Sequence, residues 1–301
     1  MENNCHSNSR IEKATRECLN ELRAMRYSEM TLNLYEMAIN DFVRHVKKDD
    51  PRRITAQDIE KYRGVLFERG FKPSSVITYS QSINLFFKHM EETQQIFVNP
   101  MTGLARIRKS HELQPVPTEE EMQILLAQPD VTTPTGIRNR AMLETVYSAG
   151  VRRRELMDMT VQCLDLDNGR ARIMGKGQKE RMVPLGTEAV KWIKLYLLNV
   201  RRTLVREYKG DALWLNKTGK PLDYGNTEQM LRCCNRAPGI TTRIGLHSIR
   251  RACATHMLRR GASAASIQLL LGHADMCHLS EYLKVSISDL KKAHEESRLG
   301  Q

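Results

Sequence analysis

The sequence predicts a mainly α-helical protein of two domains, with one small antiparallel β-sheet in the C-terminal domain. The chain has 301 residues, and a domain usually holds about 100–200. Apolar residues recur at helical spacing along most of the chain, whereas residues 163–186 alternate between apolar and polar side chains as strands do. Apolar residues make up 41% of the chain, which is enough for a core in each domain.

The N-terminal part, from residue 10 to about 110, is predicted to be a helical domain with short turns. The expected helices cover residues 11–26, 28–46, 55–70 and 72–92. Ser28 or Thr31 can cap the second helix, Thr55 caps the third, and Gly70 ends it. Pro73 begins the fourth helix. We find no convincing strand pattern in this part.

A linker is expected between domains at residues 1–110 and 118–301. Residues 99–117 hold three prolines, one glycine and a basic cluster of Arg106, Arg108 and Lys109, which favours an extended chain. Its last part, 111–117, separates the two domains. The basic cluster suits contact with an anionic partner, but a merely solvated linker explains it as well.

The C-terminal domain is predicted to place a small sheet among helices. Thr118 and Glu121 fit a capping box at the start of its first helix. Residues 163–186 are broken at Asp167-Asn168-Gly169 and at Gly175-Lys176-Gly177, so we expect three antiparallel strands with Lys176 at the second turn. The expected helices cover residues 117–128, 136–150, 152–160, 187–208, 226–237, 247–261, 263–272, 281–286 and 287–300, and a short strand is expected at 211–216.

The net charge of +12 and the pI of about 9.5 indicate an anionic partner, most simply nucleic acid. Charge alone also fits a basic enzyme with no such partner. No stretch of about twenty apolar residues occurs, and the first residues lack an apolar signal-peptide core, so we expect a cytoplasmic protein without a membrane span.

The seven cysteines are odd in number and form no C-x-x-C pair, which argues against a disulfide framework or a zinc finger. Neither His247 nor His273 has a cysteine or carboxylate at ligand spacing, so we expect no metal site.

Candidate catalytic positions are Arg152, Lys176, His247 with Arg250, His273, and Tyr282. His247 and Arg250 are three residues apart and therefore share one helical face. An arginine fork can grip two phosphate oxygens, and a histidine can donate a hydrogen bond to a third. Each position alone also has an ordinary explanation: a solvated charge run, a hairpin turn, a surface helix, a cap or core histidine, and a core tyrosine.

The combination is more specific, because two long blocks resemble one family. The block "SAGVRRRELMDMTVQCLDLDNGRARIMGKGQKERMVPLG" and the block "GLHSIRRACATHMLRRGASAASIQLLLGHADMCHLSEYLKV" are similar to the corresponding blocks of tyrosine recombinases, the phage-integrase and Xer-type family. The resemblance is strong over residues 117–294. It reaches the helical first domain weakly, through its general pattern and the "NPMTGL" linker.

The resemblance implies a role for each of the candidate positions. Tyr282 resembles the nucleophile, and Lys176 the hairpin lysine that acts as general acid. Arg152, His247, Arg250 and His273 resemble the groups that hold the scissile phosphate, and Glu155 would orient Arg152. The segment "MCHLSE" departs from the family pattern, which makes His278 an unusual neighbour of Tyr282.

Phosphodiester chemistry suits these residue types independently. Two arginines and histidine donors fixed around a phosphate stabilise the negative charge that develops during attack. A phenol, whose pKa is about 10, needs help to attack. The leaving 5′-hydroxyl needs a proton, which a positioned lysine supplies. We therefore expect neither a metal nor a cofactor.

The expected function is that of a site-specific DNA recombinase or integrase, as encoded by mobile elements. The resemblance implies a helical core-binding (SAM-like) domain and a catalytic domain that clamp duplex DNA. It also implies a 3′-phosphotyrosyl intermediate and a homotetramer that joins two DNA sites through a Holliday junction. A related recombinase or accessory DNA-bending proteins are further partners, and Arg106, Arg108, Lys109, Lys179 and Arg181 are expected to contact DNA. The final helix, 288–297, docks on a neighbouring protomer or on its own domain.

The alternatives are a type IB-like topoisomerase, a resolvase of replicon dimers, and a DNA-binding regulator on a catalytically decayed scaffold. The same six residues serve a topoisomerase or a resolvase equally well, whereas their presence argues against the regulator.

Overall fold

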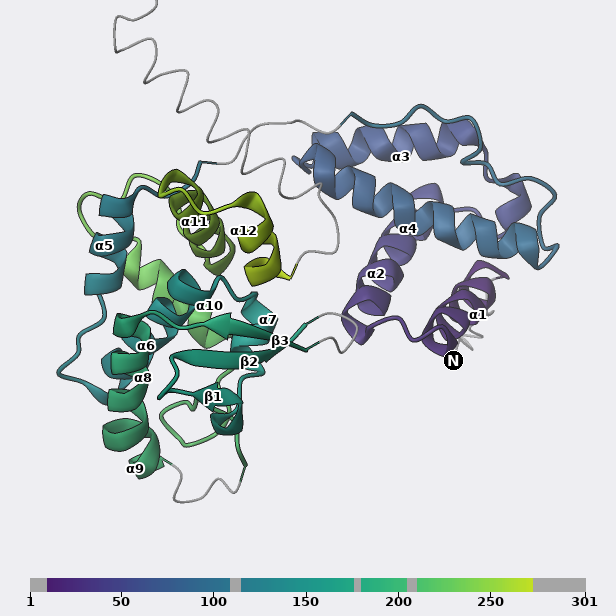
Figure 1. Ribbon diagram of the computed structural model, residues 1–301. Coiled ribbons are helices and arrows are strands. Elements are labelled where there is room, and N and C mark those ends of the chain that lie inside the picture. The colour runs from purple at the N-terminus through teal and green to yellow at the C-terminus, as the bar shows by residue number, and fades with distance from the viewer. Residues whose placement is uncertain (1–9, 109–114, 176–179, 205–209, 273–301) are drawn as a thin grey trace, which may run out of the picture. The chain divides into compact units, whose positions relative to one another are not determined.

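The computed structural model describes residues 10–108, 115–175, 180–204 and 210–272. The chain falls into two compact units, residues 1–112 and residues 113–301 (Figure 1). Each unit has its own hydrophobic core. The domain borders at residues 110 and 118 stay a prediction.

The first unit is a helical domain, as the sequence predicts. Its elements are α1 (Arg10–Ala24), α2 (Glu29–Val46), the 3-10 turn η1 (Pro51–Arg53), α3 (Ala56–Glu68) and α4 (Pro73–Glu92). Ser28 rather than Thr31 caps α2, because its side chain accepts a hydrogen bond from the Thr31 N–H. Phe42 packs edge-on against both Tyr62 and Phe87, which joins α2, α3 and α4 at the centre of the core.

The first part of the predicted linker packs back onto this helical unit. Asn99 donates from Nδ2 to Asn84 Oδ1 at 3.0 Å, and Arg63 donates from Nη1 to the Ala105 carbonyl at 3.1 Å. Leu104 lies partly buried against the same core. The chain from 99 to 107 therefore belongs to the first unit and is not an extended, fully solvated segment.

The second unit surrounds a buried central helix. Its helices are α5 (Glu119–Ala127), α6 (Pro134–Ala149), α7 (Arg153–Met157), α8 (Thr187–Tyr196), α9 (Arg202–Leu204), α10 (Tyr224–Cys234), α11 (Leu246–Arg259) and α12 (Ala264–Leu271). Helix α6 packs against α5, α8 and α11. The helical run predicted over 187–208 is interrupted, because residues Leu197–Arg201 form a π-helical turn, η3, between α8 and α9.

The predicted sheet is confirmed. Strands β1 (Leu164–Asp165), β2 (Arg170–Met174) and β3 (Glu180–Pro184) are antiparallel in the order β1-β2-β3. Ala171, Ile173 and Val183 point into the core, while their neighbours along each strand are more exposed. Lys176 lies in the connection between β2 and β3, outside the described residues.

The short strand predicted at 211–216 is not formed. Its backbone is divided between two partners: Leu213 N–H donates to the Met159 carbonyl, and Leu222 N–H donates to the Trp214 carbonyl. Two isolated bridges result, and no ladder extends from either of them. In the described parts of the chain, no helix is both long and apolar enough to cross a membrane.

Candidate active site: an arginine cluster at the end of α12

The site begins at the first turn of α7, where Arg152 directly precedes the helix and Glu155 lies one turn on. The Glu155 carboxylate accepts a hydrogen bond from the Arg152 backbone N–H at 2.8 Å and another from Arg152 Nη1 at 2.7 Å. A glutamate at this position satisfies an N–H that has no partner inside the helix. The same carboxylate thereby fixes both the backbone and the guanidinium of Arg152.

Strand β3 brings a second arginine to Glu155. Arg181 Nη1 donates to Oε1 at 2.9 Å, and Arg181 Nη2 donates to Oε2 at 2.7 Å, in a two-pronged ion pair. Burial by itself raises the pKa of Glu155. The hydrogen bonds from Arg181 and Arg152 outweigh this effect and bring the pKa down to about 2. Glu155 is therefore an ionised acceptor at neutral pH, and its four hydrogen bonds leave it no role as a base.

Helix α11 supplies the third arginine, Arg250, which is 1% exposed. Its Nη1 donates to the carbonyl of Gly150, and its Nη2 donates to the Leu271 carbonyl at 2.7 Å. Gly150 ends α6 with a φ of 57°, in the left-handed region that glycine adopts readily. Arg250 Nη1 also lies 3.9 Å from Glu155 Oε2.

The three arginines hold three consecutive carbonyls at the C-terminus of α12. Arg181 Nε donates to Leu270 O at 3.0 Å, Arg250 Nη2 to Leu271 O at 2.7 Å, and Arg152 Nη2 to Gly272 O at 3.2 Å. The last carbonyls of a helix lack partners inside the helix and carry its partial negative charge. Guanidinium groups are suited to this end of a helix, and here they fix the backbone that leads directly into His273.

The cluster keeps an excess of positive charge. Three guanidinium groups and one carboxylate give a formal charge of +2 (3 − 1). The Arg152 side chain is 35% exposed, and His247 is exposed one helical turn before the buried Arg250. An anion at the surface of the cluster would therefore meet donors that the rest of the site already orients.

The structure brings four of the predicted residues together: Arg152, Glu155, Arg181 and Arg250. His247 is placed on the same helix as Arg250. The other catalytic candidates, Lys176, His273 and Tyr282, lie outside the described residues. Two of the expected DNA contacts, Lys109 and Lys179, lie outside them as well. The remaining expected DNA contacts in the linker, Arg106 and Arg108, are exposed.

Arg181 was expected to contact DNA, which stays a prediction. Its side chain is 13% exposed, and its guanidinium donates to both oxygens of Glu155 and to the Leu270 carbonyl. Sequence reasoning missed this pairing, as well as the acceptor carbonyls of residues 150 and 270–272. Every residue type has the same main-chain carbonyl, so the sequence does not reveal which carbonyls accept these bonds. The one indication of these two helix ends was the glycine that follows each helix, Gly150 and Gly272.

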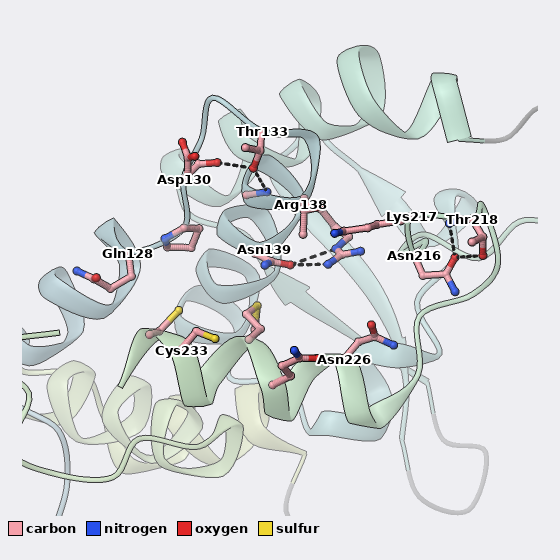
Figure 2. A pocket seen from close by; sticks show the side chains of 16 residues that line it. Gln128, Asp130, Thr133, Arg138, Asn139, Asn216, Lys217, Thr218, Asn226 and Cys233 are labelled. Atoms are coloured by element: carbon pink, nitrogen blue, oxygen red, sulfur yellow. Dashed lines mark hydrogen bonds between the residues drawn. The ribbon is translucent and has the colours of Figure 1, made fainter. Parts of the chain in front are cut away.

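A separate cavity of about 530 Å³ lies between the start of α6 and one face of α10 (Figure 2). Its polar wall is largely satisfied by its own members: Arg138 donates to Asn139 Oδ1, and Thr218 donates to Asn216 Oδ1. None of the predicted site residues that the structure describes lines this cavity. Within the same described ranges, no three His, Cys, Asp or Glu side chains gather as metal ligands would.

Both units of the chain match families of known proteins. Residues 116–288 match the phage integrase family, and residues 16–96 match the N-terminal SAM-like domain of phage integrases. Tyrosine recombinase XerD of Shewanella oneidensis is 30% identical over 89% of this chain and 90% of its own length. XerD of Listeria monocytogenes is 32% identical over 89% of this chain and 92% of its own length.

Solved structures show the same fold. The XerH recombinase bound to a palindromic difH substrate aligns with a TM-score of 0.76 at 19% identity, over 97% of this chain and 90% of XerH. A lambda integrase dimer bound to a COC' core site aligns with a TM-score of 0.73 at 17% identity, over 90% of this chain and 94% of that one.

These findings define the class of protein: an enzyme that cleaves and rejoins DNA strands. The chain belongs to the phage integrase family, and it is a site-specific tyrosine recombinase. The relatives support this assignment over a topoisomerase and a decayed regulator.

Proposed function

We propose that the protein recombines specific double-stranded DNA sites by using Tyr282 as the nucleophile. The phenol oxygen attacks the scissile phosphate, forms a 3′-phosphotyrosyl bond and releases the 5′-hydroxyl. Attack by a 5′-hydroxyl on that bond reverses the step and rejoins a strand without an external energy source. Lys176 donates the proton to the leaving 5′-oxygen.

The observation that carries this proposal is the arginine cluster. Arg152 and Arg250 come from segments about a hundred residues apart, yet both hold the end of α12 and both approach Glu155. Fixed N–H donors beside a surface are suited to the non-bridging oxygens of a phosphodiester. His247 adds a donor on the exposed face of α11. His273 follows Gly272 directly and is expected to complete the set.

The proposed assembly is a homotetramer that joins two DNA sites through a Holliday junction. A solved structure similar to this chain is a lambda integrase tetramer bound to a Holliday junction, with a TM-score of 0.73. We propose that each protomer clamps its site with the helical domain and the catalytic domain. Accessory DNA-bending proteins or a related recombinase are proposed as further partners. The reaction is proposed to take place in the cytoplasm.

The test is Tyr282→Phe on a nicked suicide substrate that loses its 5′-hydroxyl strand after cleavage. The wild type should accumulate a covalent protein–DNA complex that maps to the peptide containing Tyr282. The phenylalanine variant keeps the ring and loses only the attacking oxygen, so it should bind DNA with unchanged affinity and form no adduct. Tyr224→Phe is the matched control, because Tyr224 is a partly exposed tyrosine of the same unit.

A covalent complex that persists in Tyr282→Phe, or that maps to another tyrosine, would overturn the assignment of the nucleophile. An adduct lost in both tyrosine variants would show that the assay reports on folding rather than on chemistry.

A further inference from the structure

We infer that Arg181 is a positioning residue, which sets the geometry of Arg152 and of the backbone before His273 and does not bind the DNA backbone. This inference rests on the proposed function, because it needs Arg152 and His273 at the scissile phosphate. Arg181 acts by donating hydrogen bonds to two groups, the Glu155 carboxylate and the Leu270 carbonyl.

The first observation is that each of the three guanidinium nitrogens of Arg181 donates a hydrogen bond within the protein. Nη1 and Nη2 take one oxygen each of Glu155, at 2.9 and 2.7 Å, while Nε takes Leu270 O at 3.0 Å. Hydrogen bonds that involve a charged group are stronger than those between neutral groups. The Arg181 side chain is only 13% exposed, so the fork is better placed to hold the protein than to hold DNA.

The second observation is the close packing of Gly272 on Arg181. A Cβ built on Gly272 would lie 3.0 Å from both Cδ and Nε of Arg181 and 3.1 Å from its Cζ. Gly272 has a φ of 61°, in the left-handed region. The turn that leaves α12 therefore lies directly against the guanidinium, and Arg181 supports this turn from the side of β3.

The third observation is that β3 is itself held in place. Arg181 pairs with Ile173 of the neighbouring strand, and Ile173 is 2% exposed in the core. Arg181 thus transmits the position of a packed sheet to α7 through Glu155 and to α12 through Leu270. The sheet hairpin that carries Lys176, the arginine helix and the chain entering His273 are joined by one side chain.

Loss of Arg181 should disturb Arg152 through Glu155. Glu155 is buried and accepts four hydrogen bonds, of which Arg181 supplies two. Without them, burial would raise the pKa of Glu155, and a protonated carboxyl holds a guanidinium less firmly. A misplacement of about 1 Å at a reacting centre can cost about a hundredfold in rate.

The experiment compares Arg181→Met and Arg181→Lys with the wild type on the suicide substrate, with DNA at saturation. We expect both variants to slow adduct formation by about ten- to a hundredfold, because lysine keeps the charge but cannot reproduce the three-bond fork. The dissociation constant for DNA and its salt dependence should stay unchanged. Arg170→Met is the control, because Arg170 is an exposed, ion-paired arginine of the same sheet, and it should react at the wild-type rate.

The pH profile separates positioning from a general loss of structure. The charged groups that face Glu155 are Arg152 from α7, Arg181 from β3 and Arg250 from α11. The pKa of Glu155 is about 2 in the wild type, so its carboxylate stays ionised from about pH 8 to about pH 5.5. In Arg181→Met the pKa rises, so the ratio of variant rate to wild-type rate should fall as the pH falls. Adding Glu155→Gln to Arg181→Met should remove this dependence.

Several outcomes would overturn the inference. A lysine variant with the wild-type rate would show that Arg181 supplies charge alone. A salt slope reduced by about one would show a direct phosphate contact. A constant rate ratio across the pH range would mean that Glu155 does not transmit the effect. If Arg181→Met does not fold, Arg181→Lys decides alone. A wild type that forms no adduct contradicts the proposed function itself.

Discussion

Glu155 shows how one buried carboxylate organises a cationic site. It has the hydrogen-bonding capacity of two oxygens, and the protein fills it with two arginines and a backbone N–H. Arginines brought together without such a partner repel one another. With it, the pKa of Glu155 is lowered to about 2, so the carboxylate stays ionised near neutral pH and offsets part of the arginines' mutual repulsion.

Arg250→Lys should be nearly as damaging as Arg250→Ala. A lysine has one point of charge and cannot reach both the Gly150 and the Leu271 carbonyls, which the fork of Arg250 connects. Both substitutions leave a buried carbonyl without its donor, at a cost of about 1–3 kcal/mol. Adduct formation at saturating DNA measures the effect, with Arg154→Lys as the control on an exposed arginine of α7. Near-wild-type strand exchange by Arg250→Lys would mean that Arg250 supplies only general charge.

His256 should make the stability of the second unit depend on pH. Its Nε2 donates to the Pro117 carbonyl, which leaves Nδ1 to accept from Tyr147 Oη, so the neutral ring fits this site. Burial lowers the pKa of His256 below its ordinary value of 6.5. A lowered histidine pKa contributes stability above the unfolded pKa and loses it as the pH falls through the folded one.

Urea titrations at about pH 8 and about pH 5.5 check this dependence. The free energy of unfolding should fall toward the lower pH in the wild type, and less so in His256→Gln. Glu121 and Glu155 have pKa values of about 2 and stay ionised throughout this range. An equal fall in both proteins would remove His256 as the cause.

At the scale of elements, the sequence predicts the helices and the sheet because their signals are local. Caps such as Thr55 and Thr118, and the alternation in residues 163–186, depend only on neighbouring residues. The strand expected at 211–216 failed because its backbone is divided between distant partners. The π-helical turn within the run predicted over 187–208 gave no signal in its apolar spacing.

The contacts of the site likewise divide into local ones, which the sequence predicts, and long-range ones, which it does not. Arg152 with Glu155, and His247 with Arg250, are pairs three residues apart, so helical geometry alone predicts that they share a face. Arg181 meets Glu155 across 26 residues, through a sheet whose position depends on tertiary packing. No local pattern contains that contact, and the structure was needed to find it.

Gly272→Ala should impair cleavage more than Gly261→Ala. Both glycines follow a helix with a positive φ, 61° and 88°, so both substitutions meet left-handed strain, which destabilises by more than about 0.4–1 kcal/mol. Only at Gly272 does the new Cβ meet Arg181, because nothing lies within 4 Å of the Cβ position at Gly261. Rates on the suicide substrate and thermal unfolding together check the difference. Equal rates for the two variants would show that the end of α12 tolerates displacement.

Lys176→Ala should slow cleavage more than binding. The lysine belongs to the connection between Met174 of β2 and Glu180 of β3, outside the described residues. Loss of a general acid costs about a hundred- to ten-thousandfold in rate. In a substrate with sulfur at the 5′-bridging position, the leaving group is a thiolate, which departs without a proton. This substrate should therefore restore most of the rate to the variant. If the sulfur substrate is no faster with the variant, Lys176 is not the acid.

At the scale of the whole molecule, DNA binding should depend steeply on salt. The net charge is +12, and exposed arginines such as Arg106 and Arg108 of the first unit add to a cationic surface. A protein that makes six or more phosphate contacts loses about a thousandfold in affinity between about 50 and 200 mM salt. Gel-shift titrations over this range measure the slope. A flat response would contradict clamping of the duplex by both units.

The three carbonyls at the end of α12 also bear on how the enzyme tolerates mutation. Every residue except proline offers the same main-chain groups, and even proline keeps its carbonyl. Substitutions at Leu270 and Leu271 therefore leave the acceptors of Arg181 and Arg250 in place. Substitution of an arginine removes its hydrogen bond to this helix end. Substitution of Leu270 or Leu271 leaves the bond's acceptor in place and acts instead through core packing, because both side chains are buried.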